Sequence, residues 1–170
     1  MRKGTAVVYR VFISYSTNDL PLVNKLRPAL YQMRSMGVEV YIAEYNVPPG
    51  ARLDEHIKSH LACCDLFCVL WSRNAKESAW VSQEIGLAEA HRRLIVPIML
   101  DDGLPLPGFI QDRKYISACE GIECASQRLT QIINDNLHQK AVVLQQQKDK
   151  NAVAVIFLGA LLFIVLAAKK

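Results

Sequence analysis

Several signatures of common protein classes are missing from this sequence. It holds no glycine-rich phosphate loop, no nucleophile elbow and no HExxH pattern, so nucleotide hydrolases, α/β-hydrolases and zinc proteases of those types find no support. Charge of one sign is not concentrated either. The 20 Lys and Arg against 16 Asp and Glu give a net charge of +4 and are scattered, which does not indicate a nucleic-acid partner. No signal peptide is visible, so we expect the bulk of the chain to stay inside the cell.

Cysteine is too sparse and too irregular for a disulfide framework. The odd number of five comprises Cys63, Cys64, Cys68, Cys119 and Cys124. This pattern favours reduced cytosolic thiols, although a Cys119–Cys124 pair stays open. His56 and His60 lie four residues apart, one turn before Cys63 and Cys64, as metal ligands can. A structural zinc site needs four converging ligands, and adjacent cysteines point to different faces, so we expect no metal.

Apolar runs and helical patterns alternate along the first 137 residues. Runs typical of buried strands occur at 6–15, 38–43, 66–71, 94–100 and, more briefly, 115–116. Between and after them, apolar residues recur at helical spacing within 22–36, 53–61, 78–93 and 129–137. The alternation predicts a doubly wound, flavodoxin-like α/β fold with a parallel five-stranded sheet and helices on both faces.

The C-terminal part of the sequence has a different composition. Residues 152–168 form an uncharged run of about 17 residues, near the lower limit for a membrane-spanning helix. Lys148, Lys150, Lys169 and Lys170 bracket it, as interfacial anchors do. We therefore predict a domain over 1–137, a stalk over 138–150 that is either helical or flexible, and a transmembrane helix with a basic tail over 151–170. The alternative is a buried core helix, which would show a polar face that this run lacks.

Five short motifs occur in the order seen in TIR (Toll/interleukin-1 receptor) domains. They are Arg10-Val-Phe-Ile-Ser-Tyr15, Pro48-Pro49-Gly50, Cys64-Asp65, Ser78-Ala-Trp80 followed by Glu84, and Val96-Pro97-Ile98. Together they make residues 6–135 similar to the bacterial branch of that family. The resemblance implies one of two roles: a self-associating signalling scaffold, or an enzyme that cleaves the nicotinamide–ribose bond of NAD+.

Glu84 is the catalytic residue that this resemblance implies, because enzymatic members carry a glutamate four residues after a tryptophan. Residues four apart share a helix face, so the Trp80 indole and the Glu84 carboxylate are expected to project together. One carboxylate suffices for this reaction, since the nicotinamide of NAD+ already carries a positive charge, departs as a neutral molecule and needs no general acid to protonate it. The alternatives are a solvated helix glutamate at 84 and plain core packing at 80.

The resemblance also implies the walls of a nucleotide pocket. Tyr15, Ser16 and Thr17 would form one wall, and the loop from Glu44 to Leu53 the other. Two departures stand out: Ala43 replaces an acid common in bacterial members, and Ser16 and Thr17 stand where some active members have arginines. Phosphate contacts would then come from Arg52 or from backbone amides near Asn18.

The resemblance, together with the apolar C-terminal run, implies a membrane-anchored NAD+ glycohydrolase of prokaryotic defence or cell-death signalling. NAD+ is the expected substrate, with no cofactor, and the product is either ADP-ribose or a cyclic form. Self-association through TIR domains would activate it by ordering the loop around Pro48 and Pro49, and residues 152–168 would hold it in a bilayer by a single pass with the domain in the cytoplasm. The alternative is a non-enzymatic scaffold that recruits other TIR proteins to a membrane.

Overall fold

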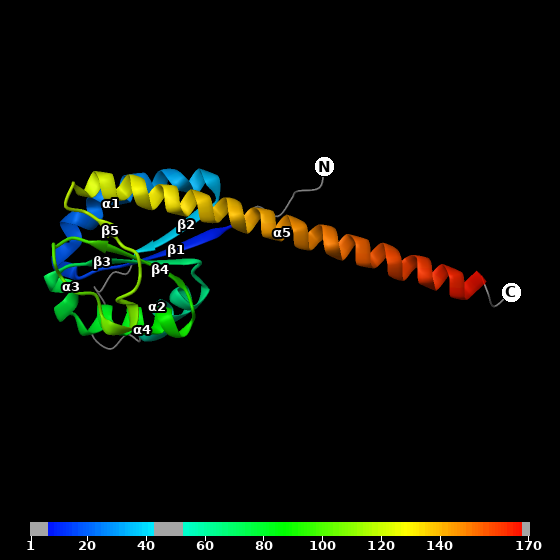
Figure 1. Cartoon of the computed structure of the whole chain (residues 1–170), viewed down its shortest axis with the longest axis horizontal. Coiled ribbons are helices and arrows are strands. Elements are labelled where there is room, and N and C mark those ends of the chain that lie inside the picture. Colours follow the sequence, from blue (N-terminus) through cyan, green and yellow to red (C-terminus); the bar gives the residue numbers. More distant parts are fainter. Residues whose placement is uncertain (1–6, 43–52, 168–170) are drawn as a thin grey trace. The chain divides into compact units, whose positions relative to one another are not determined.

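The computed structural model describes residues 7–42 and 53–167, with the backbone alone for 53, 54, 56 and 153–167. The chain divides into two compact units, Met1–Ile133 and Asn134–Lys170. The first unit holds the whole sheet and every helix up to the first turns of the last one (Figure 1). The domain limits drawn from the sequence remain predictions.

A parallel five-stranded sheet forms the centre of the first unit. Its strands are β1 (Tyr9–Ser14), β2 (Val38–Ile42), β3 (Leu66–Trp71), β4 (Leu94–Met99) and β5 (Ile116–Ser117). They are arranged in the order β2-β1-β3-β4-β5. This is the flavodoxin-like order, and the predicted five-stranded parallel sheet is confirmed. In such sheets the direction of winding reverses between β1 and β3, and ligands bind beyond the carboxyl ends of the strands at that point.

Helices connect the strands. They are α1 (Leu20–Gln32), α2 (Leu53–Cys63), α3 (Arg73–Glu77), α4 (Ala79–Ala90) and α5 (Ile122–Ala167), with short 3-10 turns η1 (Thr17–Asp19), η2 (Met33–Met36) and η3 (Gly108–Ile110). The sequence did not predict α3. It forms because the Ser72 hydroxyl accepts a hydrogen bond from the Ala75 amide at 2.9 Å and so caps a single short turn of helix. Ser78, which accepts from the Val81 amide, then starts α4 as predicted.

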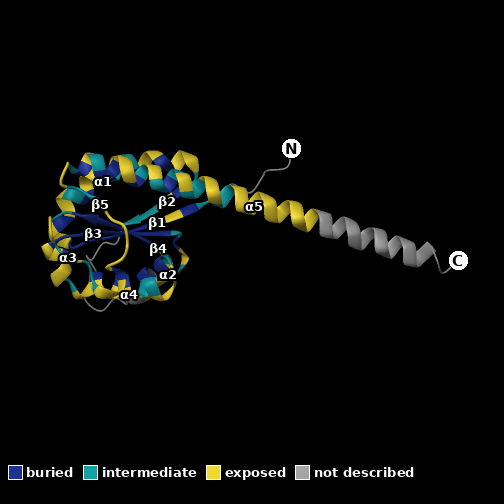
Figure 2. Cartoon of the chain, in the orientation of Figure 1, coloured by how far each residue is buried: buried dark blue, intermediate teal, exposed yellow. Residues whose placement is uncertain are grey.

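Helices cover both faces of the sheet. Alternate strand side chains, including Phe12, Phe67 and Val69, pack in one cluster with apolar side chains of α2, α3 and α4. Figure 1 shows α1 and the beginning of α5 on the other face. Strand β3 is buried along its whole length, and Figure 2 shows it entirely in the buried colour. A strand covered on both faces explains the continuous apolar run at 66–71.

Gly37 ends the first helical segment at a point that only glycine suits. Its φ of +88° lies in the left-handed region, and a β-carbon there would stand 2.6 Å from the Val7 carbonyl oxygen. The Gly37 carbonyl accepts a hydrogen bond from the Tyr9 amide at 2.9 Å, which ties this turn to the start of β1. The predicted stop after Met36 is thus confirmed.

The second unit consists of the remainder of α5. The helix begins at Ile122, earlier than predicted, and its backbone continues through residues 138–150, so the helical alternative for this segment holds. No Gly or Pro interrupts residues 122–158, which removes the usual helix breakers. Among the helices whose residues are described, none is both long and apolar enough to cross a bilayer. The side chains of 153–170, on which the predicted span depends, lie outside the described residues.

Candidate functional site

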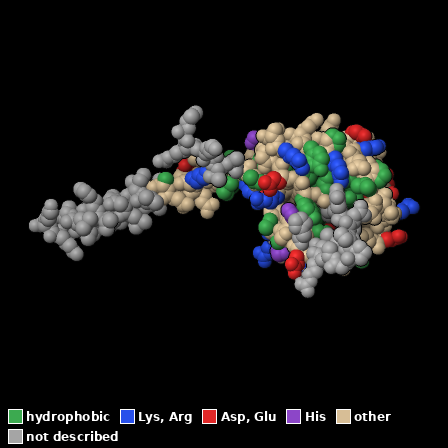
Figure 3. Space-filling view, turned by 180° about the vertical axis from the view of Figure 1, so that it is seen from behind, with side chains coloured by type: hydrophobic (Ala, Val, Ile, Leu, Met, Phe, Trp, Pro, Cys, Tyr) green, Lys and Arg blue, Asp and Glu red, His purple; other side chains and the backbone are tan. Residues whose placement is uncertain are grey.

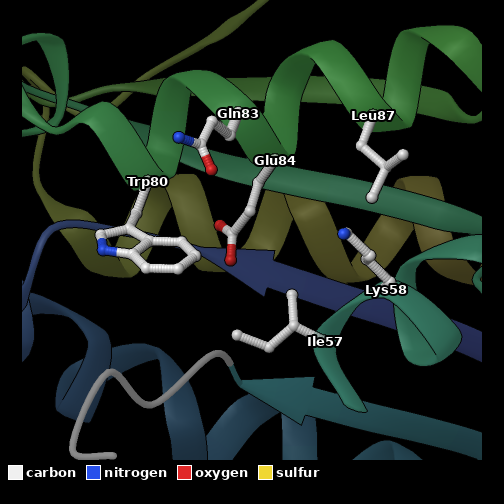
Figure 4. Close-up of a pocket in the computed structure, with 6 residues that line it drawn as sticks. All are labelled: Ile57, Lys58, Trp80, Gln83, Glu84 and Leu87. Carbon is white, nitrogen blue, oxygen red and sulfur yellow. The ribbon is translucent and has the colours of Figure 1, made fainter. Parts of the chain in front are cut away.

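A cavity of about 140 Å³ lies between α2 and α4. It is lined by Ile57, Lys58, Trp80, Gln83, Glu84 and Leu87. Figure 4 shows Ile57 and Lys58 on one side of it, with the four α4 residues opposite. Apolar side chains supply half of this lining, and one carboxylate, one ammonium and one amide supply the polar groups. Such a mixture is typical of a site that holds a partly apolar ligand by a few fixed polar contacts.

Glu84 is buried in the wall of this cavity, with 3% of its surface exposed. The buried positions of α4 are Val81, Glu84, Ile85 and Ala88, which is the spacing of a single helix face. The carboxylate therefore occupies a place where the pattern calls for an apolar side chain. Its Oε2 accepts a hydrogen bond of 2.5 Å from the Ser14 hydroxyl at the end of β1. The alternative of a solvated helix glutamate is wrong.

Trp80 lies one turn before Glu84 and lines the same cavity. Its side chain is 45% exposed, so it is not the core-packing residue of the alternative interpretation. Figure 4 shows the indole beside the Glu84 carboxylate, as their four-residue spacing predicts. An exposed indole next to a buried acid offers a flat apolar surface on which an aromatic ring can stack.

The predicted residues after the first strand lie at its carboxyl end. Tyr15 and Ser16 are buried, with 2% and 7% of their surface exposed, whereas Thr17 is exposed and begins η1. The structure does not place these three among the described residues that line the Glu84 cavity.

The structure does not describe most of the loop residues that are expected in the pocket. Glu44, Arg52 and Ala43 lie outside the described residues, and so does the loop that carries Pro48 and Pro49. Leu53 starts α2, but its side chain is likewise outside the described part of the chain. The predicted roles of these residues stay predictions.

A second buried carboxylate, which sequence reasoning missed, belongs to Asp19. It is 6% exposed and accepts hydrogen bonds from the Ser72 hydroxyl at 2.5 Å and the Asn74 amide at 2.8 Å. Asp19 stands at the N-cap position of α1, yet its side chain makes no capping bond. The contact instead links the connection after β1 to the beginning of α3. An acid placed four residues beyond the end of a buried strand was a signal that could have indicated this link.

Two further cavity residues, and one residue that contacts Glu84 from behind, were also missed. Lys58 and Gln83 line the cavity from α2 and α4, and Ser14 reaches Glu84 from β1. The helical spacing that makes position 84 a buried position of α4 was readable in the sequence. The meeting of Ser14 and Glu84, which are 70 residues apart, was not, because it depends on tertiary packing.

The His56 side chain lies outside the described residues, and among the side chains that are described no group of three or more His, Cys, Asp or Glu is arranged to hold an ion. The His60 ring stacks on Tyr41 at 4.1 Å between centroids. Cys63 is exposed and Cys64 is buried, so the two adjacent thiols point apart as predicted. Burial raises the pKa of the Cys64 thiol to about 11, against a smaller lowering by Arg93. All five cysteines are free thiols, including Cys119 and Cys124.

Charged side chains are interspersed over the first unit. On the face seen in Figure 3, Lys and Arg side chains stand among Asp and Glu rather than in a field of one sign. Exposed ion pairs occur at Arg10–Glu39, Arg113–Glu89 and Arg128–Glu120, each with a closest distance of 3.0 Å. The distinctive electrostatic feature of the described chain is therefore inside it, where two acids are buried.

Solved structures with the same fold come from several kinds of protein. The TIR domain of the Toll-related receptor TRR-2 of Hydra magnipapillata is 17% identical, with a TM-score of 0.55, covering 78% of this chain and 97% of that one. A CMP N-glycosidase of Clostridium botulinum is 19% identical, with a TM-score of 0.54 and coverages of 71% and 97%. A prokaryotic SEFIR domain is 21% identical, with a TM-score of 0.52 and coverages of 74% and 92%. At these identities the likeness establishes the fold.

The family to which the chain belongs is established by comparison of its sequence with family models. No curated protein matches the chain. A family model described as the TIR domain matches residues 11–133, which include all five strands except the first two residues of β1. The matched segment also contains Glu84, Trp80 and Ser14. Since this match spans well over half of the sequence, the chain belongs to the TIR domain family.

Proposed function

We propose that this TIR domain is an NAD+ glycohydrolase in which Glu84 is the catalytic carboxylate. The observation that carries the proposal is the burial of Glu84 in the wall of a cavity, beside an exposed indole. Burying a carboxylate costs free energy unless it is paired and hydrogen-bonded, so a buried acid in a cavity wall is a candidate functional group. Glu84 has a hydrogen bond from Ser14 and also faces space that a ligand can fill.

The reaction needs a fixed negative charge more than it needs an acid. The bond from C1′ of the ribose to the nicotinamide nitrogen breaks, and its electron pair neutralises the pyridinium as nicotinamide leaves. The ribose then carries oxocarbenium character, which a preorganised carboxylate in a water-poor site stabilises. Water adds its oxygen to C1′ and releases one proton, which yields ADP-ribose. If an atom of the nucleotide adds instead of water, the product is a cyclic ADP-ribose.

The other cavity residues suit a dinucleotide. The Trp80 indole offers a stacking surface for an aromatic base, and the Lys58 ammonium offers a positive charge for a phosphate. Arg52 and backbone amides near Asn18 remain the further phosphate contacts that we propose. The clostridial CMP N-glycosidase, which shares the fold, acts by its name on an N-glycosidic bond, the class of bond that NAD+ cleavage breaks.

We also propose that activity depends on assembly at a membrane. TIR domains would associate with one another and order the loop around Pro48 and Pro49, and residues 152–168 would anchor the chain in a bilayer. Confinement to a surface raises the effective concentration, so that weak self-contacts form. Fractionation checks the anchor: deletion of residues 151–170 is expected to release the protein from membranes, and equal solubility of both forms would refute it.

The alternative of a non-enzymatic scaffold draws on a different part of the surface. Phe109 and Tyr115 expose 55% and 57% of their surface, and aromatic side chains are enriched at protein–protein interfaces. A scaffold needs no buried acid at position 84, however, and its recruitment of other TIR proteins would not depend on that residue. The two accounts therefore separate on a Glu84 variant.

The experiment is NAD+ turnover by the purified full-length chain, clustered by a crosslinked affinity tag, with the products resolved by chromatography. The variants are Glu84→Ala and, as a matched control, Glu77→Ala, which removes an exposed glutamate of the neighbouring α3. We expect the wild type and Glu77→Ala to release nicotinamide and Glu84→Ala to release none. A folded, clustered wild type that leaves NAD+ intact would overturn the enzyme and favour the scaffold. The chromatogram also separates linear from cyclic product.

A further inference from the structure

Ser14 is the last residue of β1 and is completely buried. Its hydroxyl donates to Glu84 Oε2 at 2.5 Å, so the contact joins the central sheet to α4. Figure 4 shows the Glu84 side chain reaching from α4 toward the strand drawn in the blue of β1. The hydrogen bond thus holds the carboxylate on the side of the cavity nearest the sheet.

Ser14 stands at a position of β1 that faces the apolar cluster, where a hydroxyl group needs an explanation. Side chains two residues apart in a strand point to the same face, and Phe12 belongs to the apolar cluster beneath α2 and α4. Ser14 pairs in register with Val69 of β3, which belongs to the same cluster. An apolar side chain would suit this place better, because a buried hydroxyl is costly unless it is bonded. Its bond goes to Glu84.

We propose that Ser14 is the positioning residue of Glu84, and that its hydroxyl keeps the carboxylate ionised and fixed in direction at the cavity wall. This inference rests on the proposed NAD+ cleavage for its effect on rate, but not for its effect on Glu84 itself.

The physical basis is a balance between burial and hydrogen bonding. Removal from water disfavours a charged carboxylate, and a donor aimed at one of its oxygens favours it. A separation of 2.5 Å is at the short end for a hydroxyl that donates to an ionised acceptor. A serine held by the strand backbone also restricts the carboxylate to one rotamer, which a water molecule would not do.

The effect of Ser14 on Glu84 has to be distinguished from that of two other charged groups of the described chain. Lys58 of α2 lines the same cavity, and its positive charge also favours an ionised Glu84. Asp19, the other buried acid of the described chain, is engaged by Ser72 and Asn74. A substitution at Ser14 keeps all of these residues, so the comparison of Ser14→Ala with the hydroxyl-retaining Ser14→Thr reports the effect of the hydroxyl on Glu84.

The direction of the pH effect follows from the charge that the reaction needs. Only the ionised form of Glu84 stabilises the developing positive charge, so activity is present above the pKa of Glu84 and is lost as the pH falls through it. Loss of the Ser14 donor favours the neutral form and raises this pKa. A hydrogen bond to a charged group is worth enough to move the acid limb of the rate profile upward by about one to two pH units.

The experiment compares Ser14→Ala with Ser14→Thr, which keeps a hydroxyl, and with Ser126→Ala, which removes a buried serine from α5. Two readouts are taken on the full-length chain. The first is the pH dependence of the NAD+ cleavage rate. The second is the carboxyl ¹³C titration of Glu84, assigned by the signal that disappears in Glu84→Gln, and it requires no activity.

We expect Ser14→Ala to raise both the carboxyl titration midpoint and the acid limb by about one to two pH units. Ser14→Thr and Ser126→Ala are expected to leave both near the wild-type values. An unchanged midpoint in Ser14→Ala, or a loss of rate that is equal at every pH, would overturn the inference. A wild type without activity counts against the proposed function, and the titration still decides the role of Ser14.

Discussion

The two buried acids of the described chain, Asp19 and Glu84, have similar exposure and different surroundings. Asp19 is held by two side chains of the segment that follows β3. Glu84 is held by Ser14 and also faces a cavity with an exposed tryptophan in its wall. Burial alone therefore does not identify a functional acid. The cavity beside Glu84 is the further observation that matters, because a carboxylate can act on a ligand only where the ligand fits.

Replacement of Glu84 by glutamine should produce the largest change and should separate the two acids most clearly. Glutamine keeps an acceptor for the Ser14 hydroxyl but removes the negative charge, so NAD+ cleavage is expected to fall about 100- to 1000-fold. The fold should be unaffected, because a buried charge is lost without loss of its hydrogen bond. Initial rates and a thermal melt of the same preparation measure both. A melting temperature that falls together with the rate would mean that Glu84 is structural.

Replacement of Asp19 by alanine should have the opposite profile. It leaves the hydroxyl of Ser72 and the amide of Asn74 without their acceptor, which is expected to cost about 2–3 kcal/mol of unfolding free energy. Urea unfolding followed by circular dichroism measures this loss. The Asp19→Ala protein that stays folded is expected to keep the NAD+ affinity of the wild type. If the unfolding free energy were unchanged and the affinity for NAD+ were lost, Asp19 would have a role in substrate binding and not in stabilising the fold.

Replacement of Trp80 by alanine tests the space beside Glu84. The indole is 45% exposed, so its removal should change the unfolding free energy little. Loss of a stacking surface is expected to weaken substrate binding by about 1–2 kcal/mol, or roughly ten-fold in KM. Steady-state kinetics against NAD+ measure it. An unchanged KM would contradict this role of Trp80 and would mean that the aromatic base of NAD+ binds elsewhere.

Replacement of Arg113 by alanine supplies the smallest effect and the baseline for the comparison. Its ion pair with Glu89 has both side chains more than a third exposed, so water and salt screen it. The expected change in unfolding free energy is below about 1 kcal/mol. Urea unfolding at low and high salt checks this. A loss as large as that of Asp19→Ala would show that exposed charges also hold this fold together.

The sequence predicts the fold better than the site, for a physical reason. Apolar periodicity and the capping serine at 78 determine strands and helices locally, and right-handed connections restrict the possible strand orders to a few. Glu84 was reached through a family resemblance, and its burial is consistent with the apolar face of α4. Ser14, Lys58 and the Asp19 contacts depend on which side chains meet across the fold. No local pattern carries that information.

The most direct test of the central claim is cellular NAD+ after induction of the full-length chain and of Glu84→Ala at equal protein levels. The account predicts that NAD+ falls with the wild type, with nicotinamide and an ADP-ribose product appearing, and that it does not fall with Glu84→Ala. Equal NAD+ loss in both strains would contradict the role of Glu84. Unchanged NAD+ in both, together with no cleavage by the clustered purified protein, would contradict the enzyme.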